Sequence, residues 1–264
     1  MNHAPRILTI AVGNTRTRAG LFDGGQLLES VVFQGSDPNH GRQSLERLIT
    51  EGQAPEMAAI ASVNDSVAER VGDLVRELLP DTCLARVGRD LDMPIRHTLD
   101  DPSTVGHDRW LNAIGAFSRT RQACVIVDVG TAVTVDFVDG EGVFHGGVIF
   151  PGLNMMLRAL HEGTAALPEL TFAMPDRSRG ALGKDTAHAM MLGAIVAVRG
   201  GVRTQLEQCA HLYGAYPQII ATGGDAAILE EEGLIEHFVP DLQLIGMHVC
   251  VMHAAGEDAE STDE

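Results

Sequence analysis

Aromatic residues and positive charge are both scarce in this chain. Only 4% of its 264 residues are aromatic, with one Trp and two Tyr, which disfavours an aromatic-rich recognition surface. Lys and Arg total 19 against 36 Asp and Glu. The resulting formal net charge of -17 repels nucleic acid and anionic lipid at long range. The sequence therefore predicts neither a nucleic-acid partner nor a membrane partner.

Paired cysteines and long apolar runs are also missing. None of the four cysteines has the C-x-x-C spacing of a zinc or thiol redox motif. Cys124 and Cys250 lie in apolar runs, which favours buried reduced thiols over disulfides. No stretch reaches the roughly 18 apolar residues that a membrane helix needs, and residues 1–6 show no signal-peptide pattern. We therefore expect a soluble, cytoplasmic protein.

What the chain does have is enough apolar sequence for a large core. Hydrophobic residues make up 45% of it, and its length fits two half-size lobes or one large α/β domain. The 29 glycines favour tight turns and sites lined by backbone atoms.

The first half of the chain reads as three short strands followed by α/β alternation. Apolar, β-branched runs predict strands over residues 7–12, 19–22 and 27–33, with a turn at Asp23-Gly24-Gly25. These three strands would form an antiparallel meander. Helical spacing then predicts helices over 44–52 and 67–79 around a strand at 57–63. Such alternation is typical of a sheet covered by helices.

The second half repeats this order. Strands are expected over 124–131, 133–138 and 143–150, and helices over 108–119, 153–160, 186–206 and 242–254. A further strand at 217–221 precedes another helix. Because Gly13-Asn14-Thr15 and Gly130-Thr131 both follow the first strand of a half, we expect two lobes whose turns line one cleft. The predicted domains are residues 1–120, residues 121–255 and an acidic disordered tail, 256–264.

Three glycine turns carry the first sign of a ligand. Gly13-Asn14-Thr15, Gly130-Thr131 and Thr222-Gly223-Gly224 each follow a predicted strand. Glycine lets backbone N–H groups approach phosphate oxygens, and Thr adds a hydroxyl donor. None of the three is a Walker P-loop or a G-x-G-x-x-G fingerprint, and each alone is consistent with plain turn geometry. Together they favour a nucleotide site.

Two acidic positions have both a functional and a structural interpretation. Asp108 lies beside Arg109 at the start of a predicted helix, where a carboxylate could accept a proton while the guanidinium holds an anion. The alternative is an ordinary first-turn Asp that satisfies helix donors. Asp128 ends an apolar strand, where a buried carboxylate needs a cation or hydrogen-bond donors. The residues alone leave both questions open.

The ordered set of motifs resembles the type III pantothenate kinase family. The set consists of Gly13-Asn14-Thr15, Gly106 to Arg109, Val127 to Ala132, Gly146 to Gly152 and Thr222 to Gly224. Ser62-Val63, Leu167-Pro168 and Gly183 to Thr186 match the family as well. The resemblance spans nearly the whole chain.

The resemblance implies an α/β protein with an actin/hexokinase-like ATPase fold of two ribonuclease-H-like lobes, usually a homodimer. It implies transfer of the ATP γ-phosphate to the hydroxyl of pantothenate, which gives 4'-phosphopantothenate in the first step of coenzyme A synthesis. Mg²⁺ and a monovalent cation, K⁺ or ammonium, are the implied cofactors, with ATP as co-substrate.

The resemblance also assigns residues to the site. The implied catalytic base is Asp108, and the implied monovalent-cation ligand is Asp128. The implied ATP-binding residues are Ala11, Val12, Gly13, Asn14, Thr15, Arg16, Thr17, Arg18, Thr131 and Gly223. The implied pantothenate-binding residues are Gly106, His107, Asp108, Arg109 and Thr186, the last across the dimer interface.

One position departs from the family pattern. The pattern at the first turn is Asp-x-Gly-Asn-Thr, and this chain has Ala11 where the Asp is expected. In the family that carboxylate is expected to organise Mg²⁺ beside the phosphates. Two functions therefore stay open: a pantothenate kinase, slow or altered in its metal use, and a catalytically impaired relative that acts as a ligand-binding or regulatory protein.

Overall fold

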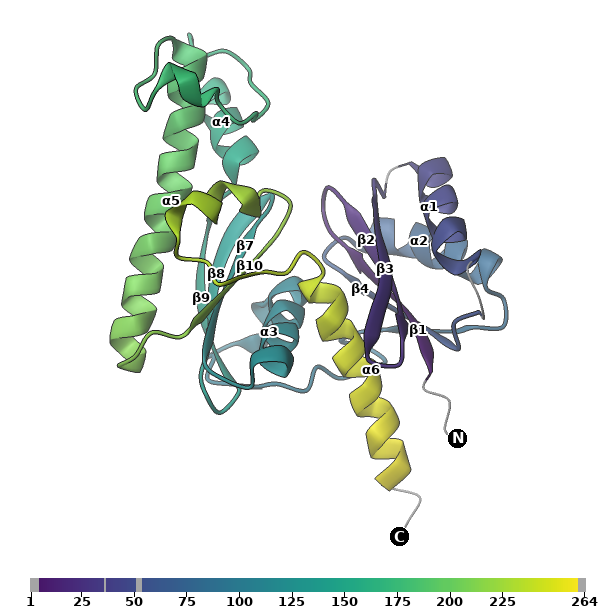
Figure 1. The fold of residues 1–264 in the computed structure, drawn as a ribbon. Coiled ribbons are helices and arrows are strands. Elements are labelled where there is room, and N and C mark those ends of the chain that lie inside the picture. Colours follow the sequence, from purple (N-terminus) through teal and green to yellow (C-terminus); the bar gives the residue numbers. More distant parts are fainter. Residues whose placement is uncertain (1–4, 36, 51–53, 261–264) are drawn as a thin grey trace. The chain divides into compact units, whose positions relative to one another are not determined.

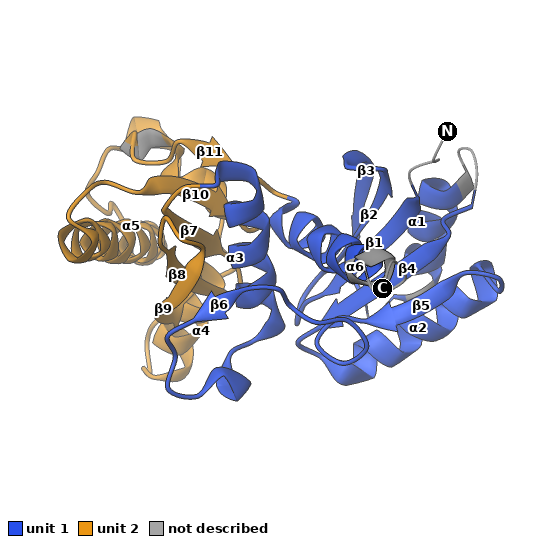
Figure 2. Cartoon of the chain, turned by 90° about the horizontal axis from the view of Figure 1, so that it is seen from below, with its two compact units in different colours: residues 1–121, 241–264 blue, residues 122–240 orange. Residues whose placement is uncertain are grey.

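The computed structural model describes residues 5–35, 37–50 and 54–260. The chain divides into two compact units (Figure 2), with residues 1–121 and 241–264 in unit 1 and residues 122–240 in unit 2. Each unit has its own sheet and its own hydrophobic core. Within the described ranges, no helix has both the length and the apolar character needed to span a membrane.

Unit 1 is built on a five-stranded sheet in the order β3-β2-β1-β4-β5 (Figure 1). Its strands are β1 (Arg6–Val12), β2 (Thr17–Asp23), β3 (Gln26–Phe33), β4 (Met57–Ser62) and β5 (Cys83–Arg86). The first three are antiparallel neighbours, which confirms the predicted meander. β4 lies parallel to β1, and β5 lies parallel to β4. The sequence did not predict β5.

Helices cover both faces of this sheet. They are α1 (Pro38–Thr50), α2 (Asp65–Leu78), α3 (His107–Thr120) and α6 (Leu242–Glu260). The segment before α3 also holds a two-residue strand, β6 (Arg96–His97), which is not part of this sheet, and an exposed 3-10 helix, η1 (Pro102–Thr104). Alternate residues of β1 point to opposite faces. Leu8 and Ile10 therefore pack with α1 and α2, whereas Ile7 and Ala11 pack with α3 and α6.

α6, the last helix of the chain, packs directly on α3. A Cβ atom on Gly246 would meet the backbone carbonyl oxygen of Leu111, and one on Gly115 would meet that of Leu242. The two helices therefore pack backbone against backbone. The predicted second lobe, 121–255, includes residues 241–255, which the structure groups with unit 1. α6 also continues to Glu260, past the start of the predicted tail, and residues 261–264 lie outside the described ranges.

Unit 2 repeats the strand order of unit 1. Its strands are β7 (Cys124–Val129), β8 (Ala132–Val138), β9 (Val143–Pro151), β10 (Gln218–Thr222) and β11 (His237–Phe238), in the order β11-β10-β7-β8-β9. β7, β8 and β9 form an antiparallel meander, and β10 lies parallel to β7. β7 therefore corresponds to β1 and β10 to β4, which confirms the repeat inferred from the sequence.

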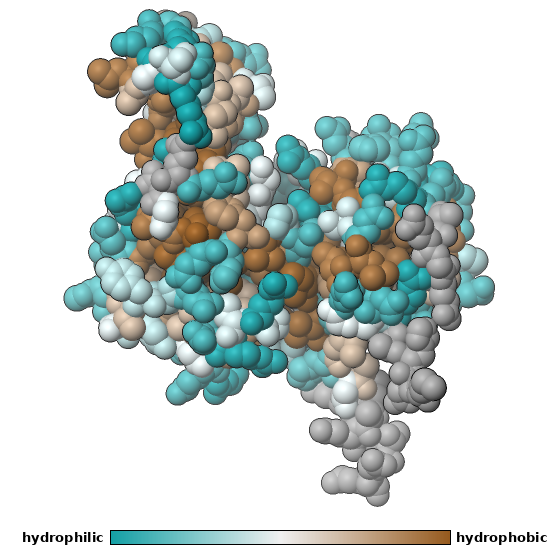
Figure 3. Space-filling model, in the orientation of Figure 1, coloured by the Kyte–Doolittle hydropathy of each residue, from teal (hydrophilic) through white to brown (hydrophobic). Residues whose placement is uncertain are grey.

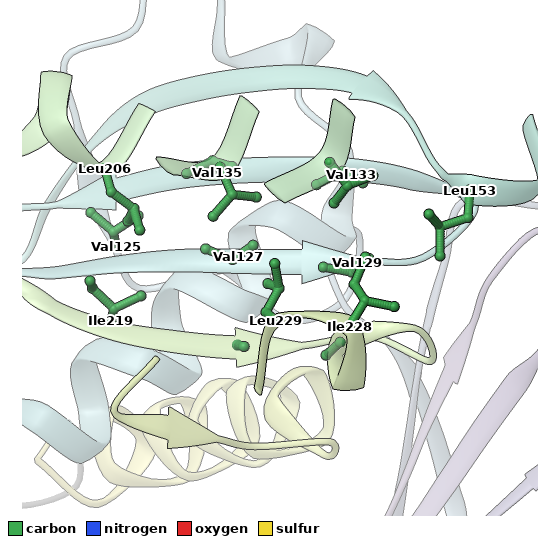
Figure 4. Close-up of a cluster of buried hydrophobic side chains, with 14 of the residues drawn as sticks. Val125, Val127, Val129, Val133, Val135, Leu153, Leu206, Ile219, Ile228 and Leu229 are labelled. Carbon is green, nitrogen blue, oxygen red and sulfur yellow. The ribbon is translucent and has the colours of Figure 1, made fainter. Parts of the chain in front are cut away.

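The helices of unit 2 pack on one face of this sheet. They are α4 (Leu153–Glu162), α5 (Thr186–Tyr213) and the 3-10 helix η3 (Ala226–Glu232), while a second 3-10 helix, η2 (Arg177–Arg179), is exposed. Figure 4 shows Val125, Val127 and Val129 in a row along β7, pointing into the cluster that α5 and η3 cover. The helix predicted to follow residue 225 is the 3-10 helix η3.

The predicted buried thiols are confirmed. Cys124 and Cys250 are both buried and free. Burial raises the pKa of Cys250 to about 12, so this thiol stays protonated at neutral pH.

His248 makes the stability of unit 1 depend on pH. Its ring stacks on Phe22 at 4.5 Å between centroids, and its Nε2 atom lies 2.7 Å from the carbonyl oxygen of Gly24. Burial lowers the pKa of His248, although the hydrogen bond to Gly24 acts the other way. As the pH falls through about 6.5, the unfolded chain takes up a proton at this residue and the folded chain resists it.

We therefore expect the free energy of unfolding to decrease as the pH falls below about 6.5. Urea unfolding across that range checks this, with His248→Gln as the comparison. The variant should lose less stability than the unsubstituted protein over the same pH interval. Equal losses would assign the pH dependence to other histidines.

Candidate functional site

In unit 1, the carboxyl ends of the parallel strands β1 and β4 carry the first glycine turn. The N–H of Val63, just after β4, donates to the carbonyl oxygen of Val12 at 3.1 Å. The N–H of Gly13 donates to the carbonyl oxygen of Arg16 at 3.0 Å, which closes the turn between β1 and β2. The turn and the end of β4 therefore lie at the same edge of the sheet. Ligands bind at this edge in open α/β sheets.

Only part of the predicted ATP-binding segment faces outward. Asn14, Thr15 and Arg16 are exposed, and Gly13 and Arg18 are half-buried. The other three members are buried: Ala11, Val12 and Thr17. The Thr17 hydroxyl has no hydrogen-bond partner in the described part of the chain. A ligand would therefore meet residues 13–16 and Arg18.

The predicted pantothenate segment lies against the same edge. Gly106 precedes the first residue of α3, and a Cβ atom at Gly106 would lie 3.9 Å from Cγ1 of Val63. Asp108 Oδ1 accepts the N–H of Arg109 at 2.9 Å. The side chains of His107, Asp108 and Arg109 are all half-buried. Unit 1 thus brings the start of α3 to the carboxyl ends of its parallel strands.

In unit 2, the corresponding edge gathers the other two glycine turns. Thr222 is the register partner of Asp128, so the ends of β10 and β7 lie side by side. Gly223 has φ +95, a conformation that favours glycine. A Cβ atom there would meet the carbonyl oxygen of Val129 and lie 2.5 Å from Asp128 Oδ1. Only glycine therefore fits beside the Asp128 carboxylate.

Gly152 supports the turn that carries Thr131. Its N–H donates to the carbonyl oxygen of Thr131 at 3.2 Å. A Cβ atom at Gly152 would lie 2.6 Å from that same oxygen, so a larger residue would displace the turn. The last glycine of the predicted Gly146 to Gly152 motif thus holds the exposed Thr131 in place.

Thr186, the last of the predicted site residues, belongs to α5. It is the exposed first residue of α5, after Asp185, whose Oδ1 accepts the N–H of His188 at 2.8 Å. That N–H and the Arg179 guanidinium lower the pKa of Asp185. Met190, four residues further along α5, is a member of the hydrophobic core of unit 2. Thr186 therefore lies about one helical turn before the first α5 residue of that core.

The first turn does not fit a carboxylate-held Mg²⁺. Ala11 is 6% exposed, and its register partners are Arg18 on β2 and Ala61 on β4. Mg²⁺ sites in phosphoryl-transfer enzymes use one or two carboxylates. Across residues 5–35, 37–50 and 54–260, no group of three or more His, Cys, Asp or Glu could hold a metal ion.

One residue at this edge, Asp241, was not predicted from the sequence. Asp241, just before α6, accepts a hydrogen bond from Nη1 of Arg18 at 2.8 Å. The two residues are 223 positions apart, and no local pattern signals the pair. Only the packing of α6 on β2 could reveal it.

The duplicated sheet and its turns at the ends of parallel strands define an α/β protein with the actin/hexokinase-like ATPase fold, as predicted. A solved structure agrees: the activator of 2-hydroxyisocaproyl-CoA dehydratase from Clostridium difficile with bound ADPNP. It superposes with a TM-score of 0.52 at 13% identity, over 98% of this chain and 97% of that one. At that identity the likeness concerns the fold alone.

Sequence comparison identifies the family. The model of the type III pantothenate kinase family matches residues 7–208. A type III pantothenate kinase from Akkermansia muciniphila is 34% identical over 246 residues, covering 92% of this chain and 97% of the relative. One from Rhodopirellula baltica is 39% identical over 204 residues, covering 70% and 71%. The chain belongs to the type III pantothenate kinase family, which confirms the resemblance read from its motifs.

Proposed function

We propose that this protein is an ATP-dependent pantothenate kinase that forms 4'-phosphopantothenate, in the first step of coenzyme A biosynthesis. The proposal rests on one observation in a chain of this family. Within unit 1, residues 106–109 lie at the same edge of the sheet as the first glycine turn. The proposed acid–base residue and the proposed phosphate turn therefore share one edge.

In unit 1, we assign the proposed roles to residues that are exposed or half-buried. Backbone N–H groups of residues 13–15 and the Thr15 hydroxyl would donate to phosphate oxygens. Arg109 would bind the carboxylate of pantothenate, since a guanidinium matches a carboxylate with two parallel hydrogen bonds. His107 would line the same pocket for pantothenate.

Asp108 would hold the proton that the reaction releases. The pantothenate hydroxyl oxygen forms a bond to the γ-phosphorus as the bond from that phosphorus to the β–γ bridging oxygen breaks, and ADP leaves. The hydroxyl proton passes to the Asp108 carboxylate. Because phosphoryl transfer depends mainly on positioning and charge stabilisation, the protein needs little further chemistry.

In unit 2, Thr131 and Gly223 would bind ATP, and Asp128 a monovalent cation. The support is that the Asp128 carboxylate and the Val129 carbonyl oxygen both lie close to Gly223, so two oxygen donors meet at this turn. Oxygen donors of this kind suit hard cations, K⁺ or ammonium here. Such an ion would supply positive charge near the phosphates. We expect Mg²⁺ to accompany ATP, and we assign it no protein ligand at residue 11.

A homodimer is part of the proposal. α5 carries an outward face of small and apolar residues: Val196 is 68% exposed, and a Cβ atom on Gly193 or Gly200 would meet no atom within 4 Å. Figure 3 shows hydrophobic residues at the surface beside α5. Small residues let a second helix approach closely, and Thr186 at the start of α5 would then reach the partner's substrate.

A catalytically impaired, ligand-binding relative is the less favoured function. The family members that match most of the chain are named as kinases. Asp108, Arg109 and Asp128 are all retained. The absence of an acid at residue 11 therefore points to slower turnover or altered metal use rather than to loss of the reaction.

The test is an ADP-release assay on the full chain with ATP, Mg²⁺, K⁺ and pantothenate. We expect ADP to form only when pantothenate is present, together with 4'-phosphopantothenate identified by mass spectrometry. Omitting pantothenate separates the kinase from a simple ATPase. A folded protein that binds ATP yet yields no phosphopantothenate would instead support the ligand-binding relative.

A further inference from the structure

The Arg18–Asp241 pair lies where the family pattern has a carboxylate. Ala11 and Arg18 are direct register partners on antiparallel strands, so their side chains lie on the same face, with Cβ atoms about 5 Å apart. This face is the one that α6 covers, and Asp241 just before α6 receives the Arg18 hydrogen bond at 2.8 Å. A cation thus occupies the neighbourhood of the missing acid.

Arg18 has donors left for a ligand. Asp241 accepts from Nη1 of Arg18, and no other partner of this guanidinium occurs in the described part of the chain. Its side chain is 28% exposed, and it lies two residues after Arg16, which closes the first turn. An Arg carries five N–H donors in a fixed plane. Nε and Nη2 are therefore available at the edge where the phosphates of ATP are proposed to bind.

We propose that Asp241 is a positioning residue that holds Arg18 toward the ATP phosphates, so that this chain neutralises phosphate charge with its own guanidinium beside Ala11. The proposal deepens the kinase function and rests on it. Ala11 is part of this arrangement, because an acid at that position would pair with Arg18 and cancel its charge. The carboxylate of Asp241 reaches Arg18 from α6 instead, which fixes the guanidinium through one of its two terminal nitrogens.

Calorimetric titration of the full chain with ATP, in Mg²⁺-free buffer at low salt, tests the proposal directly. Arg18→Met should raise the Kd for ATP about 10- to 100-fold, the usual range for losing charge-assisted hydrogen bonds. Asp241→Asn should raise it about three- to tenfold. Asn preserves the shape and the helix-capping ability of Asp, so this variant removes the charge alone. Asp241→Glu should recover part of the loss.

A matched pair elsewhere in unit 1 controls for the general effect of breaking an ion pair. Arg42 on α1 contacts Glu77 on α2 at 2.5 Å, with side chains 36% and 65% exposed. Arg42→Met and Glu77→Gln should leave the Kd for ATP within about twofold of the starting value. Thermal unfolding of all five variants shows whether any change in affinity follows from lost stability.

The Ala11→Asp substitution provides a double-mutant cycle. In Mg²⁺-free buffer this substitution should weaken ATP binding by itself, because the new carboxylate pairs with Arg18. Adding Arg18→Met to it should then cost less than about threefold, in contrast to the large loss in the original background. Additive effects of the two substitutions would overturn the proposal.

Kinetics separates a positioning role from a structural one. In Asp241→Asn the KM for ATP should rise while kcat and the KM for pantothenate change by less than about twofold. An unchanged Kd for ATP in Asp241→Asn, or equal losses in Arg18→Met and Arg42→Met, would overturn the proposal. Arg18-dependent ATP binding without phosphopantothenate formation would preserve this inference and refute the kinase function instead.

Discussion

Replacing Asp108 by Asn is expected to lower kcat for pantothenate phosphorylation about 10²- to 10⁴-fold, the range that general-base catalysis contributes. The amide keeps the size of the side chain and can still accept the N–H of Arg109, as Oδ1 does at 2.9 Å. It cannot take up the hydroxyl proton. The KM for pantothenate should therefore change little.

Asp65→Asn is the matched control for this prediction. Asp65 also lies in the first turn of a 14-residue helix of unit 1, as Asp108 does, and it is exposed. Both substitutions remove one negative charge from a helix N-terminus, which costs about 0.3–1 kcal/mol of stability. Only Asp108→Asn should lower kcat by orders of magnitude. Full activity in Asp108→Asn would remove this residue from the base role.

Replacing Gly223 by Ala is expected to reduce ATP affinity about tenfold or more and to destabilise unit 2 by about 2–4 kcal/mol. The added Cβ atom would meet the Val129 carbonyl oxygen and lie 2.5 Å from Asp128 Oδ1, at a residue with φ +95. The turn after β10 or the Asp128 carboxylate must then move. Calorimetry with ATP and thermal unfolding measure the two effects.

Gly214→Ala isolates the steric part of this effect. Gly214 also has a positive φ, +76, but a Cβ atom there would meet no atom within 4 Å. In this control the free energy of unfolding should decrease only by the conformational cost of a left-handed residue, about 1–2 kcal/mol, and the ATP affinity should stay unchanged. If the two variants behaved alike, the crowding at Asp128 would have no functional consequence.

Elements with strong local patterns were predictable. β1 to β3 and β7 to β9 are β-branched or apolar runs separated by Gly-rich turns, and the structure has each within a few residues of its expected position. β5 and β11 were missed because they have four and two residues, too few to show any alternation. η3 was expected to be a helix, and only its 3-10 geometry differs from that expectation.

The candidate site was predictable where its residues are adjacent in the chain. Gly13-Asn14-Thr15 and Gly106 to Arg109 stood out as short motifs, and Gly130-Thr131 as the repeat of the first. Their exposure was not predictable. Residues 11–18 were treated as one ATP-binding segment, yet Ala11, Val12 and Thr17 are buried, because helices cover both faces of this sheet and side chains on either face of β1 lie in a core.

The three-stranded meander of each half, the duplicated glycine turns and membership of the kinase family were determined by the sequence alone, because each rests on residues that are neighbours in the chain. The tertiary structure alone decided that α6 belongs with unit 1 and that Asp241 meets Arg18. Such contacts come from the way helices pack on a sheet, where glycines such as Gly115 and Gly246 set how closely two backbones approach. Local pattern carries no signal for a pairing across 223 residues.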